Sequence, residues 1–185
     1  LTKGVAYREI CNVIDTETFC MQDKSACRKE LDIDANEKVL VFGAAKLNDP
    51  IKGAEMLFSA IEKSGIKDDL LLVLFGSIKN DEEFLSRIPC RYKFIGAVTD
   101  KSKLVQIYSA ADIIVVPSHY ESLSLVIAEA MACGTPALAF DSGGQTTLID
   151  HKENGYLAHY PSVDDFAEGI NWLLQNADED MRKSA

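Results

Sequence analysis

Apolar and polar residues follow one another along the chain in blocks typical of alternating strands and helices. Short continuous apolar runs, several of them closed by glycine or proline, predict buried strands at residues 38–43, 70–75, 91–95, 112–116, 136–140 and 156–158. Apolar residues at helical spacing predict helices between them, at residues 51–63, 81–87, 101–110, 123–133 and 163–175. Strands and helices in this alternation form right-handed crossovers. The expected fold class is therefore α/β, with a parallel sheet covered by helices on both faces.

The two ends of the chain lack this regular pattern. Residues 1–37 are polar and irregular apart from a short helix expected at residues 24–31, and we interpret them as a lead-in rather than a core element. Residues 38–177 then form the domain, and residues 178–185 are interpreted as the start of a truncated helix. Because the chain also begins with Leu1 rather than Met, we expect it to be part of a longer protein.

Composition places the chain among ordinary globular proteins. Apolar residues make up 47% and charged residues 26% of its 185 residues, which argues against disorder. No apolar run approaches the roughly 18 residues of a transmembrane helix. Residues 1–19 carry charges throughout and so do not form a signal peptide. The five cysteines are odd in number, and no pair has the two-residue gap of a zinc site. Reduced, packing thiols in a cytoplasmic protein are therefore expected.

The balance of acidic and basic residues limits the kinds of ligand that the chain is expected to bind. The chain has 19 basic and 29 acidic residues, and its net charge of -10 repels nucleic acid. A phosphate-bearing ligand must then be small and held by local features. No carboxylate cluster indicates a metal site.

The loop after the strand at residues 112–116 carries the clearest candidate chemistry. In a parallel sheet, ligands bind beyond the carboxyl ends of the strands, where this loop lies. A helix that begins near Leu123 would direct free backbone N–H groups at a phosphate. Glu129, about 9 Å along the helix axis, could accept hydrogen bonds from a ribose diol. Glu121, before the helix, would lie on the other side of the phosphates, near the hydroxyls of a sugar.

The alternative is that both glutamates are solvated surface residues. Two glutamates at an arbitrary spacing favour that alternative. However, the helix that contains Glu129 is rich in apolar residues, including Val126, Ile127 and Met131, so an exposed position for Glu129 is hard to arrange.

The wider motif resembles retaining glycosyltransferases of family four. Its parts are Pro117-Ser118, Glu121 and Glu129 with seven residues between them, Glu-Ala-Met-Ala-Cys-Gly-Thr-Pro at residues 129–136, and Asp-Ser-Gly-Gly at residues 141–144. The likeness extends to residues 153–157, to Gly96, to residues 110–112, and to Asn-Val-Ile-Asp at residues 12–15 with Phe19. It thus covers nearly the whole chain.

The resemblance implies the C-terminal half of a GT-B glycosyltransferase, in which two Rossmann-like domains face each other across a cleft. Residues 38–177 would be the donor-binding domain, and the acceptor would be held by an N-terminal domain outside this chain. The donor is then a nucleotide-diphosphate sugar, with no metal and no separate cofactor. Glu129 would hold the ribose and Glu121 the donor sugar. The backbone N–H groups that would meet the sugar and the diphosphate belong to Leu123, Ser124, Leu125 and Val126. The family usually has glycine at the positions of Ser122 and Ser124, a difference that leaves the donor sugar open.

Two lysines complete the expected donor site. Lys52-Gly53 resembles the family's Lys-Gly pair, whose lysine neutralises the departing diphosphate. Ala44 stands where the family has an arginine, but counting back from Lys52 places Lys46 near that position. A lysine there supplies charge without the bidentate geometry of arginine. The alternative for each lysine is a solvated loop charge, which we disfavour for Lys52 and weigh evenly for Lys46.

The resulting hypothesis is retaining transfer of a sugar to a hydroxyl acceptor, with Glu121 and Lys52 as the residues that take part in catalysis. Two alternatives are an epimerase of nucleotide sugars with the same fold and a non-catalytic nucleotide-binding module. Family resemblance favours polysaccharide or glycolipid assembly. Peripheral membrane association through the missing domain is compatible with that pathway.

Overall fold

The computed structural model describes residues 13–79 and 81–185. Six strands form the sheet: β1 (Lys38–Lys46), β2 (Leu70–Ser77), β3 (Arg91–Gly96), β4 (Ile113–Val116), β5 (Ala137–Phe140) and β6 (Gly155–Ala158). The α-helices are α1 (Lys24–Glu30), α2 (Ala54–Ser64), α3 (Asp81–Leu85), α4 (Lys101–Ala110), α5 (Leu125–Ala132), α6 (Val163–Asn176) and α7 (Glu179–Ser184). Short 3-10 turns span Pro50–Lys52, Lys67–Asp69 and Gly143–Thr147. Cys11, one of the five cysteines, and Asn12, the first residue of the Asn-Val-Ile-Asp motif, lie outside the described residues.

All strand pairs in the sheet are parallel, and the strand order is β3-β2-β1-β4-β5-β6. Between the central pair, Leu40 lies opposite Ile113 and Val41 opposite Ile114. This order is that of the doubly wound nucleotide-binding fold, in which the chain connections reverse direction between β1 and β4. The expected α/β class and the Rossmann-like parallel sheet are confirmed.

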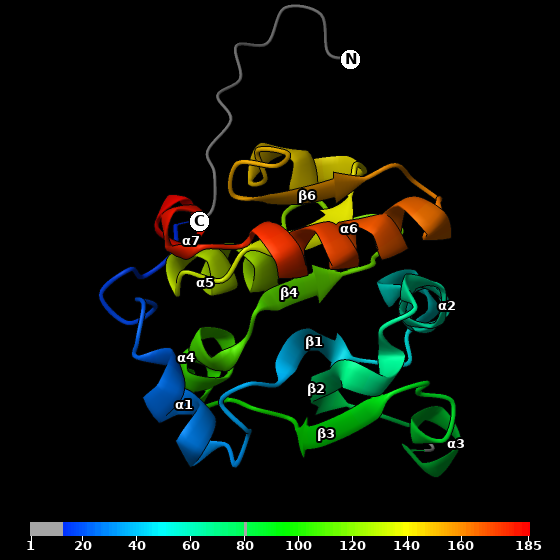
Figure 1. The fold of residues 1–185 in the computed structure, drawn as a ribbon, viewed down its shortest axis with the longest axis horizontal. Helices are drawn as coiled ribbons and strands as arrows, with labels where there is room; N and C mark the ends of the chain where they lie inside the picture. Colours follow the sequence, from blue (N-terminus) through cyan, green and yellow to red (C-terminus); the bar gives the residue numbers. More distant parts are fainter. Residues whose placement is uncertain (1–12, 80) are drawn as a thin grey trace, which may run out of the picture.

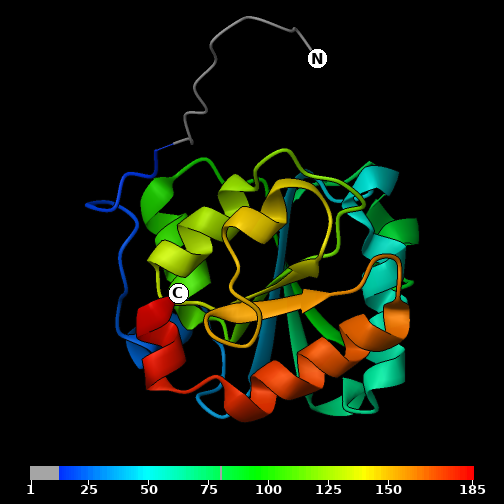
Figure 2. The same cartoon turned by 90° about the horizontal axis from the view of Figure 1, so that it is seen from above.

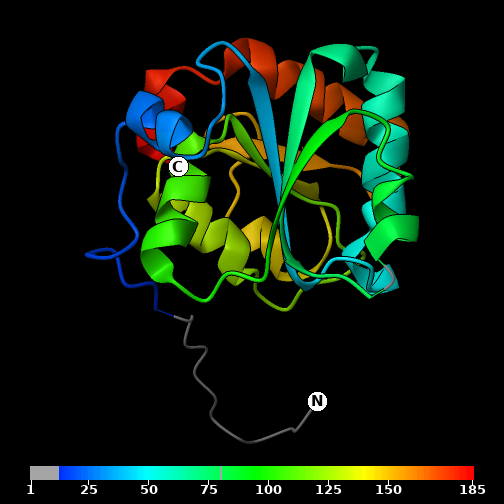
Figure 3. The same cartoon turned by 90° about the horizontal axis from the view of Figure 1, so that it is seen from below.

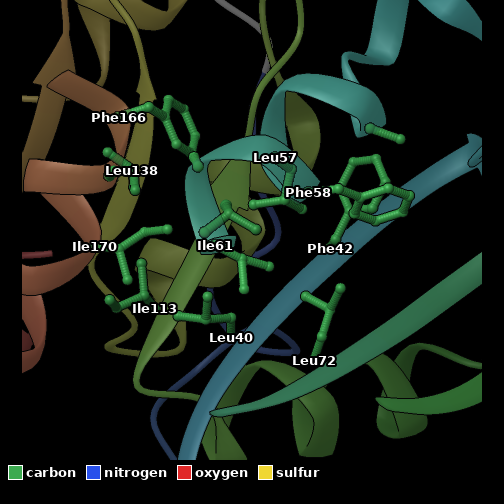
Figure 4. Packing of buried hydrophobic residues seen from close by; sticks show 14 of the residues in the cluster. Leu40, Phe42, Leu57, Phe58, Ile61, Leu72, Ile113, Leu138, Phe166 and Ile170 are labelled. Atoms are coloured by element: carbon green, nitrogen blue, oxygen red, sulfur yellow. The ribbon is translucent and has the colours of Figure 1, made fainter. Parts of the chain in front are cut away.

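Helices cover both faces of the sheet because its strands are apolar on both sides (Figures 1 and 3). One face packs against α2 and α6, and Figure 4 shows Leu40, Phe42 and their neighbours meeting side chains from both helices. The opposite face packs against α1, α4 and α5, and it buries Val39 and Val41 among others. Alternate residues of β1 thus belong to two separate hydrophobic clusters, as the period of a strand requires.

The interpretation of residues 1–37 as a lead-in outside the core is wrong for its described part. Phe19, Cys27, Leu31 and Ile33 are all buried and belong to the cluster under α4 and α5. Their apolar positions are separated by charged residues, and only the contact of α1 with α4 shows that they are buried. The proposed domain boundary at residue 37 stays a prediction.

Two helix starts differ from the sequence expectation. The helix expected at residues 51–63 is divided, because Gly53 takes a left-handed conformation (φ 71°) between the 3-10 turn and α2. The helix expected from residue 123 begins at Leu125 instead. Ser124 is extended and its hydroxyl accepts from the Ile127 N–H, so this serine caps the helix rather than continuing it.

The described start of the chain and its end lie side by side (Figures 2 and 3). Met21, Gln22 and Asp23 line a hollow together with residues of α7. Gly134, after α5, lies against both Met21 and the Arg182 carbonyl. Among the described helices, none combines the length and the apolar character that crossing a membrane requires.

Candidate functional site

The candidate site lies where the carboxyl ends of the neighbouring strands β1 and β4 meet. The chain leaves β1 towards α2 and leaves β4 towards α5, and this divergence opens the crevice in which doubly wound sheets bind ligands. A hollow of about 210 Å³ occupies this position. Its lining consists of residues 42–45, Lys52, Val116, Ser118, Glu121 and residues 123–126. The sequence-predicted residues Lys52, Glu121, Leu123, Ser124, Leu125 and Val126 are therefore brought together.

Lys52 and Glu121 form an ion pair in this hollow. The Lys52 Nζ lies 2.8 Å from Glu121 Oε1, and the two side chains are 29% and 17% exposed. The Ser118 hydroxyl donates to the same Oε1 at 2.9 Å, and Ser118 is itself buried. The carboxylate is thus held by one cation and one hydroxyl, while its second oxygen has no hydrogen-bond partner among the residues that the structure describes. From the sequence, Ser118 is expected only as part of the family motif, without a role of its own.

Backbone contacts fix the Lys52 loop against the Glu121 loop. The Asp49 carboxylate caps the 3-10 turn by accepting from the Ile51 N–H. The His119 N–H donates to the Ile51 carbonyl at 2.9 Å. A Cβ on Gly53 would lie 1.9 Å from the Pro117 carbonyl oxygen, so only glycine permits this approach. The lysine and the glutamate are therefore set by paired backbones rather than by free loops.

A third loop supports the glutamate from its other side. The Gly144 N–H donates to the Glu121 carbonyl at 2.7 Å. A Cβ on Gly143 would lie 2.3 Å from that carbonyl oxygen, and one on Gly144 would lie 1.9 Å from the Ser122 carbonyl oxygen. The sequence predicts a glycine-rich structural turn at residues 141–145. Gly143 and Gly144 follow β5, the strand next to β4. Their position in the sequence was the one signal that could have indicated a close contact with the Glu121 backbone.

The N-terminus of α5 presents backbone donors to the hollow. Because the Ser124 hydroxyl accepts from the Ile127 N–H, that donor is satisfied within the protein. The N–H groups of Leu125 and Val126 have no acceptor among the described residues, and both residues line the hollow. Free N–H groups and the helix dipole together favour an anion at this point.

Glu129 lies one helical turn beyond Leu125, outside the lining of the hollow. Its Oε2 accepts a hydrogen bond of 2.9 Å from the Tyr108 hydroxyl on α4. Burial raises the pKa of the Glu129 carboxyl above its ordinary value, while the Tyr108 hydrogen bond and the nearby Lys101 charge oppose that rise. The expectation that Glu129 is not freely solvated agrees with this partly buried position. Its role toward a ribose stays a prediction.

Lys46 lies apart from the other site residues. It ends β1, its side chain is exposed, and it is absent from the lining of the hollow. Within residues 13–79 and 81–185, it makes no ion pair. Its function in place of the family arginine stays a prediction. In the same part of the chain, no group of three or more His, Cys, Asp or Glu is arranged to hold a metal ion.

Comparisons with known proteins agree with this geometry. Residues 23–185 match the protein family described as glycosyl transferases group 1. Among curated relatives, a D-inositol 3-phosphate glycosyltransferase from Mycobacteroides abscessus is 32% identical over 167 residues, which are 87% of this chain and 37% of the relative. The chain therefore spans well under half of the length of this relative.

Solved structures show the same fold. HepE from Anabaena, in complex with UDP and glucose, aligns with a TM-score of 0.78 and 25% identity over 94% of this chain and 49% of its own. The C-terminal domain of a group 1 glycosyl transferase, LpcC from Francisella tularensis, aligns with a TM-score of 0.74 and 24% identity over 92% of this chain and 91% of its own. With its Rossmann-like sheet of the GT-B type, this chain belongs to the group 1 glycosyl transferase family.

Proposed function

We propose that this chain binds a nucleotide-diphosphate sugar and supplies the donor half of a retaining glycosyltransferase. The acceptor hydroxyl would be held by an N-terminal domain of a longer protein. The observation that carries the proposal is the Lys52–Glu121 ion pair beside the free N–H groups of α5. A cation, a carboxylate and unpaired helix donors in one hollow match the phosphates and the hydroxyls of such a donor.

The proposed reaction breaks the bond between the sugar's anomeric carbon and the diphosphate oxygen. The anomeric carbon forms a new bond to the acceptor oxygen, on the face that the diphosphate leaves, and the acceptor proton passes to the departing phosphate oxygen. Negative charge develops on the diphosphate as it departs. Lys52 and the N–H groups of Leu125 and Val126 offer fixed positive potential at that point, which is the arrangement that stabilises such a transition state.

The two glutamates have separate proposed roles. Glu121, beside Lys52, would accept hydrogen bonds from the donor sugar and orient it. Glu129, one turn into α5, would accept hydrogen bonds from the ribose hydroxyls. Support comes from HepE, which was crystallised with UDP and glucose and is 25% identical to this chain. Lys46 would add positive charge only if the chain after β1 moved towards the phosphates.

Titration calorimetry with UDP, GDP and ADP tests the donor site. We expect one of the three nucleotides to bind the wild-type chain, with about tenfold weaker binding in Lys52→Ala and in Glu129→Ala. Lys63→Ala is the matched control, because Lys63 pairs with Asp164 on the exposed surface of α2 and α6. Absence of binding to all three nucleotides would contradict the proposed donor site. Equal binding in all variants would overturn the assignment of Lys52 and Glu129.

The acceptor part of the proposal rests on the family and on the length of its members. This chain spans 37% of the length of the Mycobacteroides abscessus relative, so the acceptor half is proposed to lie outside it. We propose a cytoplasmic enzyme of polysaccharide or glycolipid assembly, reaching a membrane surface only through that half. Sugar transfer by the 185-residue chain alone, measured by release of nucleoside diphosphate with an added acceptor, would contradict the half-enzyme proposal.

A further inference from the structure

Tyr108 is a buried tyrosine whose hydroxyl points at a proposed ligand-binding residue. It lies on α4, and its side chain is 0% exposed. The hydroxyl donates to Glu129 Oε2 at 2.9 Å, and it has no other hydrogen-bond partner among the described residues. A buried hydroxyl requires one partner, and here that partner is the carboxylate proposed to bind the ribose.

The tyrosine ring is fixed from several sides. Phe75 of β2 meets it edge to face with ring centroids 5.8 Å apart, and the Phe19 ring lies 6.4 Å away. The Tyr108 carbonyl accepts from the Thr135 hydroxyl at 2.6 Å and from the Ala111 N–H at 3.0 Å. With its ring and its backbone both held, the hydroxyl is kept at one position relative to α5.

The direction of the hydrogen bond follows from the burial. Burial raises the pKa of the Tyr108 hydroxyl far above its ordinary value, so this group stays protonated and donates. Glu129 Oε2 is the acceptor, and Glu129 Oε1 has no hydrogen-bond partner among the described residues. One oxygen of the carboxylate is thereby fixed, and the other is available to a ligand.

We propose that Tyr108 is a positioning residue for the donor, holding the Glu129 carboxylate so that Oε1 meets the ribose hydroxyls. This inference rests on the proposed donor site. It assigns to Tyr108 no contact with the ligand itself. Its effect is preorganisation, because a fixed carboxylate loses less freedom on binding than a mobile one.

The test compares UDP binding by Tyr108→Phe with that by Tyr156→Phe. Tyr156 is the matched control: it is 3% exposed, and its hydroxyl donates to Asp165 at 2.8 Å, away from the site. We expect UDP affinity to fall about tenfold in Tyr108→Phe and to stay unchanged in Tyr156→Phe. Each variant removes a buried hydroxyl and should therefore lose some stability. Thermal unfolding of both variants measures that loss, so that it can be separated from the change in UDP affinity.

A pH series separates positioning from packing. Tyr108 and Lys101 of α4 and Cys133 at the end of α5 are the titratable groups that interact with Glu129. The Tyr108 hydrogen bond lowers the pKa of Glu129, so its removal raises that pKa. Because the ionised carboxylate accepts the ribose hydrogen bonds, the fall of UDP affinity on acidification should begin at higher pH in Tyr108→Phe. The phosphates of UDP also titrate, but they do so equally in the experiments with the wild type and with Tyr108→Phe. They therefore do not contribute to the difference in pH dependence between the two proteins.

A double variant gives the decisive outcome. In a Glu129→Ala background, which lacks the acceptor of the Tyr108 hydroxyl, Tyr108→Phe should cause no further change in UDP affinity, because the two residues act through one contact. An additional loss in that background, or wild-type affinity in Tyr108→Phe, would overturn the positioning role while leaving the donor site intact. Wild-type protein that does not bind UDP, GDP or ADP would instead contradict the donor site itself.

Discussion

Lys52 and Glu121 lie 69 residues apart in sequence, and yet the Lys52 Nζ is 2.8 Å from Glu121 Oε1 at the carboxyl end of the sheet. The Lys52 ammonium group is therefore paired with a carboxylate. A diphosphate that binds beside α5 must compete with Glu121 for the same ammonium group. The pair would thus couple the two proposed roles, since Glu121 would be released for the sugar if Lys52 turned to the phosphates.

Glu121→Gln should increase affinity for UDP about threefold, because it frees Lys52 and removes a negative charge beside the diphosphate. Titration calorimetry measures the change. Asp164→Asn, which breaks the exposed pair with Lys63, is the control and should leave UDP affinity unchanged. A loss of affinity in Glu121→Gln as large as that in Lys52→Ala would show that the two residues do not compete in this way.

Leu125→Pro should weaken UDP binding about tenfold without unfolding α5. Leu125 is the first residue of the helix, where proline is tolerated because the N–H has no partner within the helix. Ser124 before it is already extended (φ -90°, ψ 105°), as a residue preceding proline must be. The substitution thus removes one proposed phosphate donor while keeping the helix.

The control for this prediction is Leu125→Ala, which keeps the N–H and removes a side chain that is 47% exposed. UDP titration and circular dichroism should be measured on both variants. If Leu125→Ala weakens binding as much as Leu125→Pro, the side chain rather than the backbone N–H contacts the nucleotide.

Gly144→Ala should reduce both the stability of the fold and UDP affinity. The new Cβ would lie 1.9 Å from the Ser122 carbonyl oxygen, so the loop that carries Glu121 must move. Gly65→Ala is the matched control, because Gly65 has a φ of +73° but no atom within 4 Å of the added Cβ. It should cost about 1 kcal/mol in stability and leave UDP affinity unchanged. Thermal unfolding measures the change in stability of each variant, and titration calorimetry measures the change in its UDP affinity.

Local apolar patterning was sufficient to predict the sheet. Strands such as β2 and β4 are continuous apolar runs because both faces are buried, and their order in sequence implied a parallel arrangement. The start of α5 was predicted two residues early, because Ser124 satisfies a backbone N–H with its own hydroxyl instead of joining the helix. Such capping is a local side-chain-to-backbone hydrogen bond, which the spacing of apolar residues does not reveal.

The sequence predicted most of the residues that line the hollow but not their contacts, and the roles of these residues stay predictions. Lys52 and Glu121 were identified from motifs, whereas their ion pair depends on the neighbouring positions of β1 and β4. The support of Glu121 by Gly144 depends on β5 lying beside β4. Tyr108 is not among the residues that the sequence indicates as functional, because only the packing of α4 against α5 brings its hydroxyl to Glu129.

Asp112→Asn should destabilise the fold by about 3 kcal/mol while leaving UDP affinity unchanged. Arg28 is 5% exposed, and it donates to Asp112 Oδ2 at 2.9 Å. The same oxygen accepts from the Val39 N–H at 2.7 Å, so this carboxylate joins α1, β1 and β4. Without its charge, the Arg28 guanidinium is left buried and uncompensated beside the Lys24 ammonium group.

Urea unfolding measures the stability change, with Asp164→Asn as the matched control. The Lys63–Asp164 pair is shorter, at 2.6 Å, but its side chains are 51% and 80% exposed, so its loss should cost less than about 0.5 kcal/mol. Asp112 precedes β4 and the candidate site follows it, so the two lie at opposite ends of one strand. Equal destabilisation by the two substitutions would contradict the role of Asp112 as the partner of the buried Arg28. A loss of UDP affinity only in Asp112→Asn would show that a change at one end of β4 affects the candidate site at the other end.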